Sequence, residues 1–264
     1  MREITSAQNP LIKLVKSLDD RKRRREHGLF TAEGAKVVAS ARDQGWRPHA
    51  LLIDADAIDR PILASLARWA TAAEAEVVAV PSQLMARLVA KENPQAVLGV
   101  FHQQLSPVER VQPDAGALWV VLEQVRDPGN LGTIIRTVDA AGASGVILVG
   151  TTCDPFSVEA VRATMGSLFA VPLVRMEEDQ LLATLARWPG LVVGSHLKAS
   201  IDFRTPDYRQ PTLLVMGSEG PGLSDTLAAA CHQRVRIPMT GGADSLNLAI
   251  ATALLVYEAR RGTL

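Results

Sequence analysis

The sequence is short of cysteine and of long apolar runs, and each shortage excludes a class of protein. Cys153 and Cys231 stand alone, in no metal or redox spacing, so neither a disulfide framework nor a zinc site is expected. None of the five histidines forms a metal spacing. The longest apolar stretch, Leu248 to Tyr257, is shorter than the roughly 20 residues that span a bilayer. The chain opens with polar and then basic residues rather than a signal peptide, so we expect a cytoplasmic protein without a membrane or metal partner.

Two nucleotide-binding motifs are also missing. No G-x-G-x-x-G follows a predicted strand, and no Gly-rich loop has Lys and Ser or Thr at the spacing of a phosphate loop. A dinucleotide or a nucleoside triphosphate is therefore not expected as a ligand, which argues against a metabolic enzyme of Rossmann type. The tryptophans, at positions 46, 69, 119 and 188, are predicted to pack in the core or on the surface rather than to stack on a ligand.

Positive charge is concentrated near the N-terminus, although the chain as a whole is neutral. Residues 1–42 carry ten Lys or Arg against five Asp or Glu, and most of the excess is the run RKRRR at 21–25. The segment 6–28 around this run predicts one helix, with Asn9 suited to its cap and Gly28 to its stop. Such a run either neutralises RNA phosphates or is a solvated helix end whose cations complement the helix dipole.

Short apolar runs alternate with helical patterns along the whole chain. Residues 1–104 have the alternation of a small α/β unit, and residues 117–264 repeat it with stronger strands. The stretch between them, 105–116, holds two prolines and no periodicity, which is typical of a linker. Near-continuous apolar strands between helices predict a mostly parallel sheet that is covered on both faces.

Three Gly-rich loops are candidates for a ligand site, because open parallel sheets bind ligands beyond the carboxyl ends of their strands. They are EQVRDPGNLGTIIR (123–136), MGSEGPGLSD (216–225) and IPMTGGADSLN (237–247). Taken singly, their polar residues have simpler explanations. Asn130 and Ser245 are suited to helix caps, and Arg136 to a side chain that reaches solvent along an apolar helix. Glu219 is equally suited to an exposed position in a Gly/Pro turn.

In combination the three loops are specific. The stretches NLGTIIRTVDAAG, LLVMGSEGPGLSD and IPMTGGADSLNLAIATALLVYE, in this order over about residues 118–260, resemble the motifs of the SpoU (TrmH-like) family of RNA ribose 2′-O-methyltransferases, in the SPOUT superfamily. ITSAQNPLIK and GLFTAEGAKVV resemble the substrate-binding domain of that family. The resemblance implies an L30e-like α/β domain (1–104), a linker (105–116) and a trefoil-knotted SPOUT domain (117–264).

The resemblance also assigns residues to S-adenosyl-L-methionine and to RNA. The residues implied to line the methyl-transfer site are Asn130, Arg136, Glu219, Ser245 and Asn247. Those implied to hold the cofactor are Gly217, Glu219, Gly220, Ile237, Pro238, Met239 and Leu246. Those expected to contact RNA phosphates are Arg21, Lys22, Arg23, Arg24 and Arg25. Arg136 keeps its proton and would stabilise the developing alkoxide, while Glu219 would orient Arg136 or accept the proton.

The implied function is transfer of a methyl group from S-adenosyl-L-methionine to a ribose 2′-hydroxyl in RNA, by a homodimer. Ribosomal RNA, 23S or another, is favoured because the chain has an extra N-terminal domain, which is an argument by analogy. Two alternatives stay open: methylation of tRNA or of a base, and RNA binding without catalysis. The second is disfavoured by four residues that a pure binder would not all need, which are Arg136, Glu219, Ser245 and Asn247.

Overall fold

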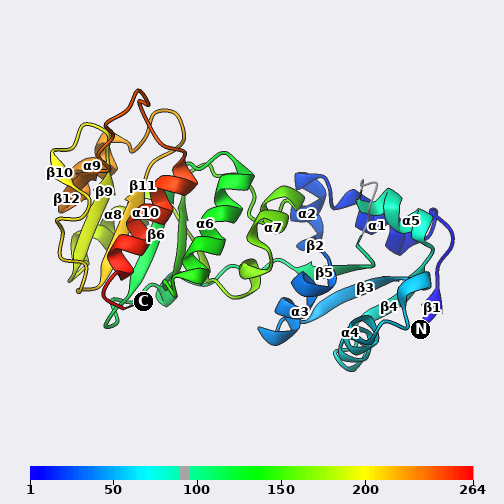
Figure 1. Cartoon of the computed structure of the whole chain (residues 1–264). Helices are drawn as coiled ribbons and strands as arrows, with labels where there is room; N and C mark the ends of the chain where they lie inside the picture. Colours follow the sequence, from blue (N-terminus) through cyan, green and yellow to red (C-terminus); the bar gives the residue numbers. More distant parts are fainter. Residues whose placement is uncertain (90–94, 264) are drawn as a thin grey trace. The chain divides into compact units, whose positions relative to one another are not determined.

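The structure is a computed structural model that describes residues 1–89 and 95–263 and forms two compact units. The first unit comprises Met1–Gln104 together with Asp154–Ala170, and the second comprises Leu105–Cys153 with the chain from Val171 on (Figure 1). The segment Asp154–Ala170, which lies in the C-terminal half of the sequence, is therefore part of the N-terminal unit. The stretch expected as a linker belongs to the second unit, where Val111 is buried in the core.

The first unit is built on a five-stranded mixed sheet with the strand order β1-β4-β3-β5-β2. Its strands are β1 (Arg2–Glu3), β2 (Leu29–Glu33), β3 (Pro48–Asp54), β4 (Glu76–Val80) and β5 (Val97–His102). Its helices are α1 (Pro10–Ser17), α2 (Arg21–His27), α3 (Ala35–Asp43), η1 (Ala55–Ala57), α4 (Pro61–Ala72), α5 (Ser82–Val89), α7 (Val158–Thr164) and η3 (Ser167–Phe169). Strand β5 runs antiparallel to β2 and β3, whereas β4 is parallel to β1 and β3. Helices α1 and α5 cover one face of this sheet, and α3 and α4 the other (Figure 1).

The segment 6–28 forms two helices, so the prediction of a single helix is wrong. The Asp20 side chain caps α2 by accepting a hydrogen bond from the Arg23 backbone N–H at 3.1 Å. An Asp that bonds its own nearby backbone favours a helix start over a helix interior. Leu18, between the two helices, is fully buried, and Gly28 ends α2 in the left-handed conformation, with φ of 64°, as predicted. The basic run is thus a short helix of its own.

The second unit has a seven-stranded sheet whose paired strands are all parallel, in the order β10-β12-β9-β11-β6-β7-β8. Its strands are β6 (Leu118–Glu123), β7 (Gly145–Val149), β8 (Leu173–Met176), β9 (Leu191–Ser195), β10 (Ile201–Asp202), β11 (Thr212–Met216) and β12 (Gln233–Arg236). Its helices are η2 (Val108–Arg110), α6 (Pro128–Ala140), α8 (Glu178–Arg187), α9 (Asp225–Ala230) and α10 (Leu248–Arg260).

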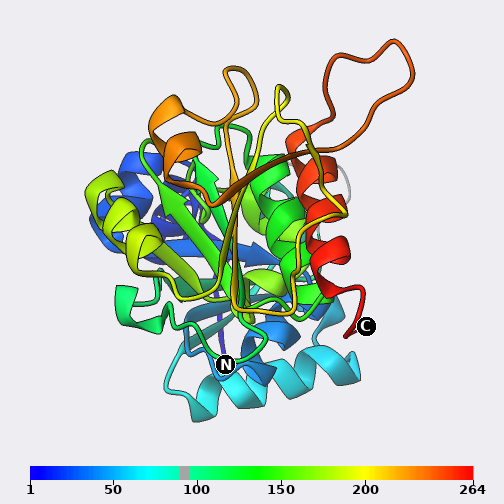
Figure 2. The same cartoon turned by 90° about the vertical axis from the view of Figure 1, so that its left-hand side faces the viewer.

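The sheet of the second unit is covered on both faces, which confirms the predicted parallel α/β architecture. Every residue of β6, β7 and β11 is buried, as expected for central strands between two helical layers. Figure 2 shows α8 and α9 on one side of this sheet and α6 and α10 on the other. Within residues 1–89 and 95–263, no helix is long and apolar enough to cross a membrane. The trefoil knot stays a prediction of the family resemblance.

Candidate active site

A cavity of about 740 Å³ lies at the carboxyl edge of the second unit's sheet. The loops that follow β6, β9, β11 and β12 line it, and Figure 2 shows the last of these, in orange-red, extending outward before α10. Open parallel sheets bind their ligands at this edge. The volume is that of a site for a small molecule or a cofactor.

Three side chains that follow three different strands are joined in series by hydrogen bonds at this cavity. Asn247 Nδ2 donates to Asn130 Oδ1 at 2.9 Å, and Asn130 Nδ2 donates to Glu219 Oε1 at 3.1 Å. The amide orientations are consistent, because Asn247 Oδ1 already accepts from the N–H groups of Ala249 and Ile250. The two side-chain hydrogen bonds therefore point the same way, from Asn247 at the start of α10 to Asn130 and from Asn130 to the Glu219 carboxylate.

Asn130 and Ser245 are not the helix caps that the sequence predicted. Helix α6 is capped by Asp127, whose Oδ1 accepts from the Asn130 N–H at 2.6 Å. Helix α10 is capped by Asn247 rather than by Ser245. Because Asp127 satisfies the first turn of α6, the Asn130 amide is left to join the other two loops.

The Glu219 carboxylate is held by more than the Asn130 amide. The backbone N–H of Arg126 donates to Oε2 at 3.1 Å, and that of Asp127 donates to Oε1 at 3.2 Å. Partial burial acts to raise the pKa of Glu219, but hydrogen bonds from Asn130 and from backbone N–H groups outweigh it and place the pKa below its usual range. Glu219 is therefore an ionised acceptor and a weak base at neutral pH.

The loop that carries Glu219 is closed on itself. Ser218 N donates to Gly222 O at 3.1 Å, and Gly222 N donates to Ser218 O at 3.2 Å. A Cβ atom at Gly217 would lie 1.9 Å from the backbone N of Leu223, so only glycine fits there. The tight backbone at Gly217 brings main-chain groups, rather than a side chain, to the cavity wall.

Most of the predicted site residues line this cavity. They are Asn130, Gly217, Glu219, Gly220, Ile237, Met239, Ser245, Leu246 and Asn247. Pro238 is exposed and is not among the lining residues. Arg136 is not among them either: it lies on α6 six residues beyond Asn130, or about 9 Å along the helix axis. Its side chain is exposed and has no hydrogen bond or ion pair in the described part of the chain.

Sequence reasoning missed part of the lining. Asp127 and Ser218 line the cavity beside the predicted residues, and so does Arg236, which ends β12 at the same edge. Glu123, the last residue of β6, is buried and accepts from Ser224 N at 2.8 Å, which ties β6 to the loop after β11. The position of these residues at the carboxyl ends of strands was the available signal.

In the first unit, the structure changes the expectation for Arg24. This side chain is only 4% exposed. Its Nη1 donates to the carbonyls of Leu18 at 2.8 Å and Asp19 at 2.9 Å, and its guanidinium pairs with Asp154 at 2.8 Å. Arg24 is therefore a buried structural residue that anchors the segment after Asp154, and we remove it from the proposed RNA contacts.

The other basic residues of α2 lie at the surface. Arg23 pairs with Glu26 at 2.8 Å, and Lys22 lies 4.0 Å from the same carboxylate. Arg21 and Arg25 are exposed. Surface pairs of this kind are weak, so the side chains can exchange their partners for a phosphate.

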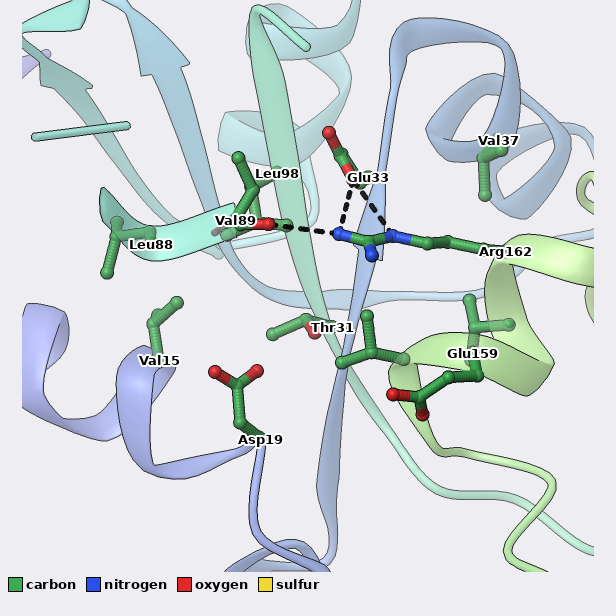
Figure 3. A pocket seen from close by; sticks show the side chains of 12 residues that line it. Val15, Asp19, Thr31, Glu33, Val37, Leu88, Val89, Leu98, Glu159 and Arg162 are labelled. Atoms are coloured by element: carbon green, nitrogen blue, oxygen red, sulfur yellow. Dashed lines mark hydrogen bonds and ion pairs between the residues drawn. The ribbon is translucent and has the colours of Figure 1, made fainter. Parts of the chain in front are cut away.

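A second cavity, of about 270 Å³, lies within the first unit among α1, α5, β2 and α7 (Figure 3). Arg162 donates from Nε at 3.2 Å and from Nη2 at 3.0 Å to Glu33, and from Nη2 to Val89 O at 3.1 Å. Asp19 and Glu159 also line this cavity, and burial raises the pKa of Asp19. Three carboxyl groups around one guanidinium do not suit an RNA phosphate. The ion pair fastens α7 to β2 instead.

The fold is of the α/β class whose members bind small molecules at the edge of a parallel sheet, and the main cavity lies at that edge. The model of the SpoU rRNA Methylase family matches residues 117–257, and that of the MRM3-like substrate binding domain matches residues 9–99. The chain belongs to the SpoU rRNA methylase family. The resemblance stated from the three loop motifs is confirmed.

Relatives match the chain over almost its whole length. It is 32% identical to the 23S rRNA (uridine(2479)-2′-O)-methyltransferase of Streptomyces viridochromogenes, over 98% of this chain and 92% of that protein. It is 30% identical to the 23S rRNA (guanosine(2553)-2′-O)-methyltransferase RlmP of Bacillus subtilis, over 98% and 100%. The AdoMet-bound rRNA methyltransferase from Sinorhizobium meliloti is 45% identical, with a TM-score of 0.93 and coverage of 100% and 98%.

Proposed function

We propose that the protein transfers a methyl group from S-adenosyl-L-methionine to a ribose 2′-hydroxyl in RNA, with ribosomal RNA as the substrate. The observation that carries this proposal is the joined set Asn247, Asn130 and Glu219 at the mouth of the 740 Å³ cavity. Two relatives that match 98% of the chain are named for this reaction on 23S rRNA. Since the substrate is ribosomal RNA, the proposed place of action is the cytoplasm.

The cavity fits the proposed cofactor. Ile237, Met239 and Leu246 supply apolar wall, and the close backbone at Gly217 supplies peptide groups for a polar edge. Lys198 and Arg236 supply cations for a carboxylate. The sulfonium of the bound cofactor supplies an electrophilic methyl group, so the reaction calls for no metal ion. The protein has to position the ribose 2′-hydroxyl and provide a path by which its proton leaves.

The three hydrogen-bonded side chains of Asn247, Asn130 and Glu219 are proposed to position the ribose rather than to accept its proton. Glu219 accepts hydrogen bonds from three partners, and its pKa is below the usual range, so it is a poor base. It fixes the Asn130 amide, which in turn fixes Asn247 at the start of α10. Ser245, which lines the same mouth, is proposed to contact the incoming ribose. With the cofactor held by the lining of the cavity, its methyl group would pass from sulfur to O2′, and the hydroxyl proton would pass to solvent water.

Arg136 is proposed to act on the RNA from the protein surface. Guanidinium groups are cations rather than bases in proteins, so its proposed part is to hold the phosphate beside the reacting ribose and to stabilise negative charge that develops on O2′. Its exposed position on α6 and its lack of a protein partner among the described residues leave the guanidinium available for this contact.

The exposed face of α10 supports a homodimer. Ile250, Leu254 and Tyr257 are 53%, 40% and 48% exposed, and with Phe203 they line a shallow hollow of about 380 Å³. Apolar side chains gathered on one helix face are typical of a protein interface. A second copy of the chain is the proposed partner for this face.

The test is methyl transfer in vitro. Purified protein, methyl-labelled S-adenosyl-L-methionine and unmodified ribosomal RNA or tRNA transcripts are incubated, and the RNA is digested to nucleosides. The proposal expects label in one 2′-O-methylated nucleoside from ribosomal RNA. Label in tRNA would retain the chemistry and replace the substrate. Label on a base, or none in either RNA, would overturn the proposal.

A further inference from the structure

The first unit has a second hollow, of about 430 Å³, which shares no lining residue with helix α2 or with the 270 Å³ cavity. We call it the tryptophan hollow. Its lining residues come from the turn between α3 and β3 and from the end of α4, and they are Gly45, Trp46, Arg47, Trp69, Ala72, Ala73 and Glu74. Trp119 and Trp188 are buried, whereas Trp46 and Trp69 are only partly buried and line this hollow, although from the sequence no tryptophan is expected to stack on a ligand.

Trp46 is a fixed wall of the hollow. Its indole Nε1 donates to the carbonyl of Phe169 at 3.0 Å. Its ring lies edge-on to the rings of Phe30 and Phe169, with centroid separations of 6.1 and 5.0 Å. A side chain held on its buried side by one hydrogen bond and two ring contacts loses little further freedom when a ligand contacts its exposed side.

Trp69 is the opposite case. It makes no ring contact with another aromatic side chain within residues 1–89 and 95–263, and its indole N–H has no acceptor in that part of the chain. Buried indoles usually find a partner for this group. A half-buried Trp that borders a hollow and keeps its N–H unused is available both for stacking and for donating a hydrogen bond to a ligand.

The polar groups of the hollow indicate the chemistry of that ligand. Arg47 is exposed and forms no ion pair with any described residue, so it can receive a phosphate. Glu74 is exposed on the same rim and can accept a hydrogen bond from an amino group. Aromatic faces beside a guanidinium are how proteins hold unpaired nucleotides, with the base on the ring and the phosphate on the cation.

We propose that the tryptophan hollow binds one unpaired base of the substrate RNA, stacked on Trp69, with its phosphate on Arg47. This rests on the proposed function in taking RNA as the substrate. The hollow lies within residues 9–99, which match the model of a substrate binding domain. Glu74 can accept a hydrogen bond from an exocyclic amino group of adenine, cytosine or guanine or from the N3–H of uracil, so the hollow is expected to accept any of the four bases.

The experiment measures RNA affinity and methyl transfer for the full chain and its variants. The probes are single-stranded RNA oligonucleotides of adenine or of uracil only, and a ribosomal RNA transcript. Trp69→Ala removes the stacking surface, Trp69→Phe keeps a ring, and Arg47→Gln removes the cation. The matched control is Ile62→Ala, which truncates an exposed apolar side chain on the same helix outside the hollow. Near-ultraviolet circular dichroism and thermal unfolding establish that each variant is folded.

The proposal expects Trp69→Ala to bind the adenine oligonucleotide roughly tenfold more weakly, since stacking of one base on an aromatic ring has about that effect. The KM for the transcript should rise by a similar factor, while kcat and cofactor affinity stay unchanged. Trp69→Phe should recover part of the loss, Arg47→Gln should weaken binding and flatten its salt dependence, and Ile62→Ala should behave as the unaltered chain.

Two outcomes separate this proposal from the proposed function. If a folded Trp69→Ala protein binds both oligonucleotides and the transcript as the unaltered chain does, the tryptophan hollow is not an RNA site, whatever the methylation assay shows. If Trp69→Ala loses RNA affinity while no RNA is methylated by any form of the chain, the hollow is an RNA site and the proposed reaction is wrong. Intrinsic tryptophan fluorescence of the unaltered chain gives a second test, because stacking on Trp69 should quench it.

Discussion

The side-chain amide of Asn247 donates to Asn130 Oδ1 at 2.9 Å, across 117 residues of chain. Asn247 also caps α10, so one side chain both starts the last helix and fixes the polar group beside the cavity. The Asn130 amide in turn donates a hydrogen bond to Glu219 Oε1. The local geometry of helix α10 and the geometry of the candidate active site are therefore set by the same contacts.

Replacing Asn247 with Ala removes both roles. The lost cap should lower the free energy of unfolding by about 1 kcal/mol. The loss of positioning should lower kcat by about 10- to 100-fold. Ser157→Ala is the matched control, because Ser157 caps α7 in the first unit and contacts nothing at the cavity. Equal activity losses for the two variants would show that Asn247 acts through helix stability alone.

The Glu219 carboxylate should stabilise the fold in a pH-dependent way. Its pKa is lowered from 4.5, so the folded state keeps it ionised at a pH where the unfolded chain is protonated. The stabilisation is fully present above 4.5 and is lost as the pH falls through the lowered pKa. The unfolding temperature of Glu219→Gln should therefore be lower than that of the unaltered chain at pH 7. The difference between the two temperatures should shrink as the pH falls. The control is Asp114→Asn, an exposed change in the loop before β6 at a side chain that has no hydrogen bond or ion pair with a described residue, and its unfolding temperature should stay close to that of the unaltered chain. If the difference in unfolding temperature stayed the same in acid, the ionised Glu219 carboxylate would not be its cause.

Arg136→Ala should abolish turnover and leave cofactor affinity intact. The physical reason is that the guanidinium contacts RNA and the reacting oxygen but does not line the cofactor cavity. Calorimetry with S-adenosyl-L-methionine and single-turnover methylation measure the two effects separately. Arg187→Ala, a surface arginine on α8, serves as the control. If a folded Arg136→Ala protein lost cofactor binding, the assignment of Arg136 to the RNA rather than to the cofactor would be wrong.

Arg24 and Arg25 are neighbours in sequence and should behave differently. Arg24→Met breaks a buried ion pair with Asp154 and should lower the free energy of unfolding by about 3–5 kcal/mol. Arg25→Ala should change it by less than about 0.5 kcal/mol. In RNA titrations, Arg25→Ala should instead reduce the slope of log affinity against log salt by up to about one unit. An Arg25→Ala protein with the original affinity and slope would remove α2 from the RNA surface.

Ile250→Asp should convert the proposed homodimer to a monomer. A charge placed on an exposed apolar helix face is tolerated in water but not in a dry interface. Sedimentation at several protein concentrations measures the mass, and Ile62→Asp on α4 is a control with a similar exposed side chain. If the unaltered chain already sediments as a monomer at micromolar concentration, the α10 face has another purpose.

Much of the fold could be predicted from local patterns. Most strands of both sheets and the helices between them appear in the sequence as apolar runs and amphipathic stretches, but the two-residue strands β1 and β10 do not. The sequence could not show that Asp154–Ala170 packs with the N-terminal unit. That docking depends on long-range partners, such as Arg24 with Asp154 and Arg162 with Glu33. It could not show that Asp20 divides the first helix either.

The candidate site was partly visible in the sequence. The three loop motifs name residues that the structure brings to one cavity, because the carboxyl ends of parallel strands share an edge. Their hydrogen bonds were not visible. Asn130 looked like a cap until Asp127 was seen to occupy that place, and Arg24 was indistinguishable from its neighbours within a basic run. Burial and partners decide such cases, and both are tertiary properties.

Nucleoside mass spectrometry on ribosomal RNA and tRNA, from cells with and without this gene, tests the central claim most directly. Our account predicts that one 2′-O-methylated nucleoside disappears from ribosomal RNA and that the tRNA nucleosides are unchanged. Restoration of the gene should return it, and restoration with Asn247→Ala should return less. Loss of a nucleoside from tRNA instead would contradict the proposed substrate. Unchanged nucleosides in both RNAs would contradict the proposed reaction.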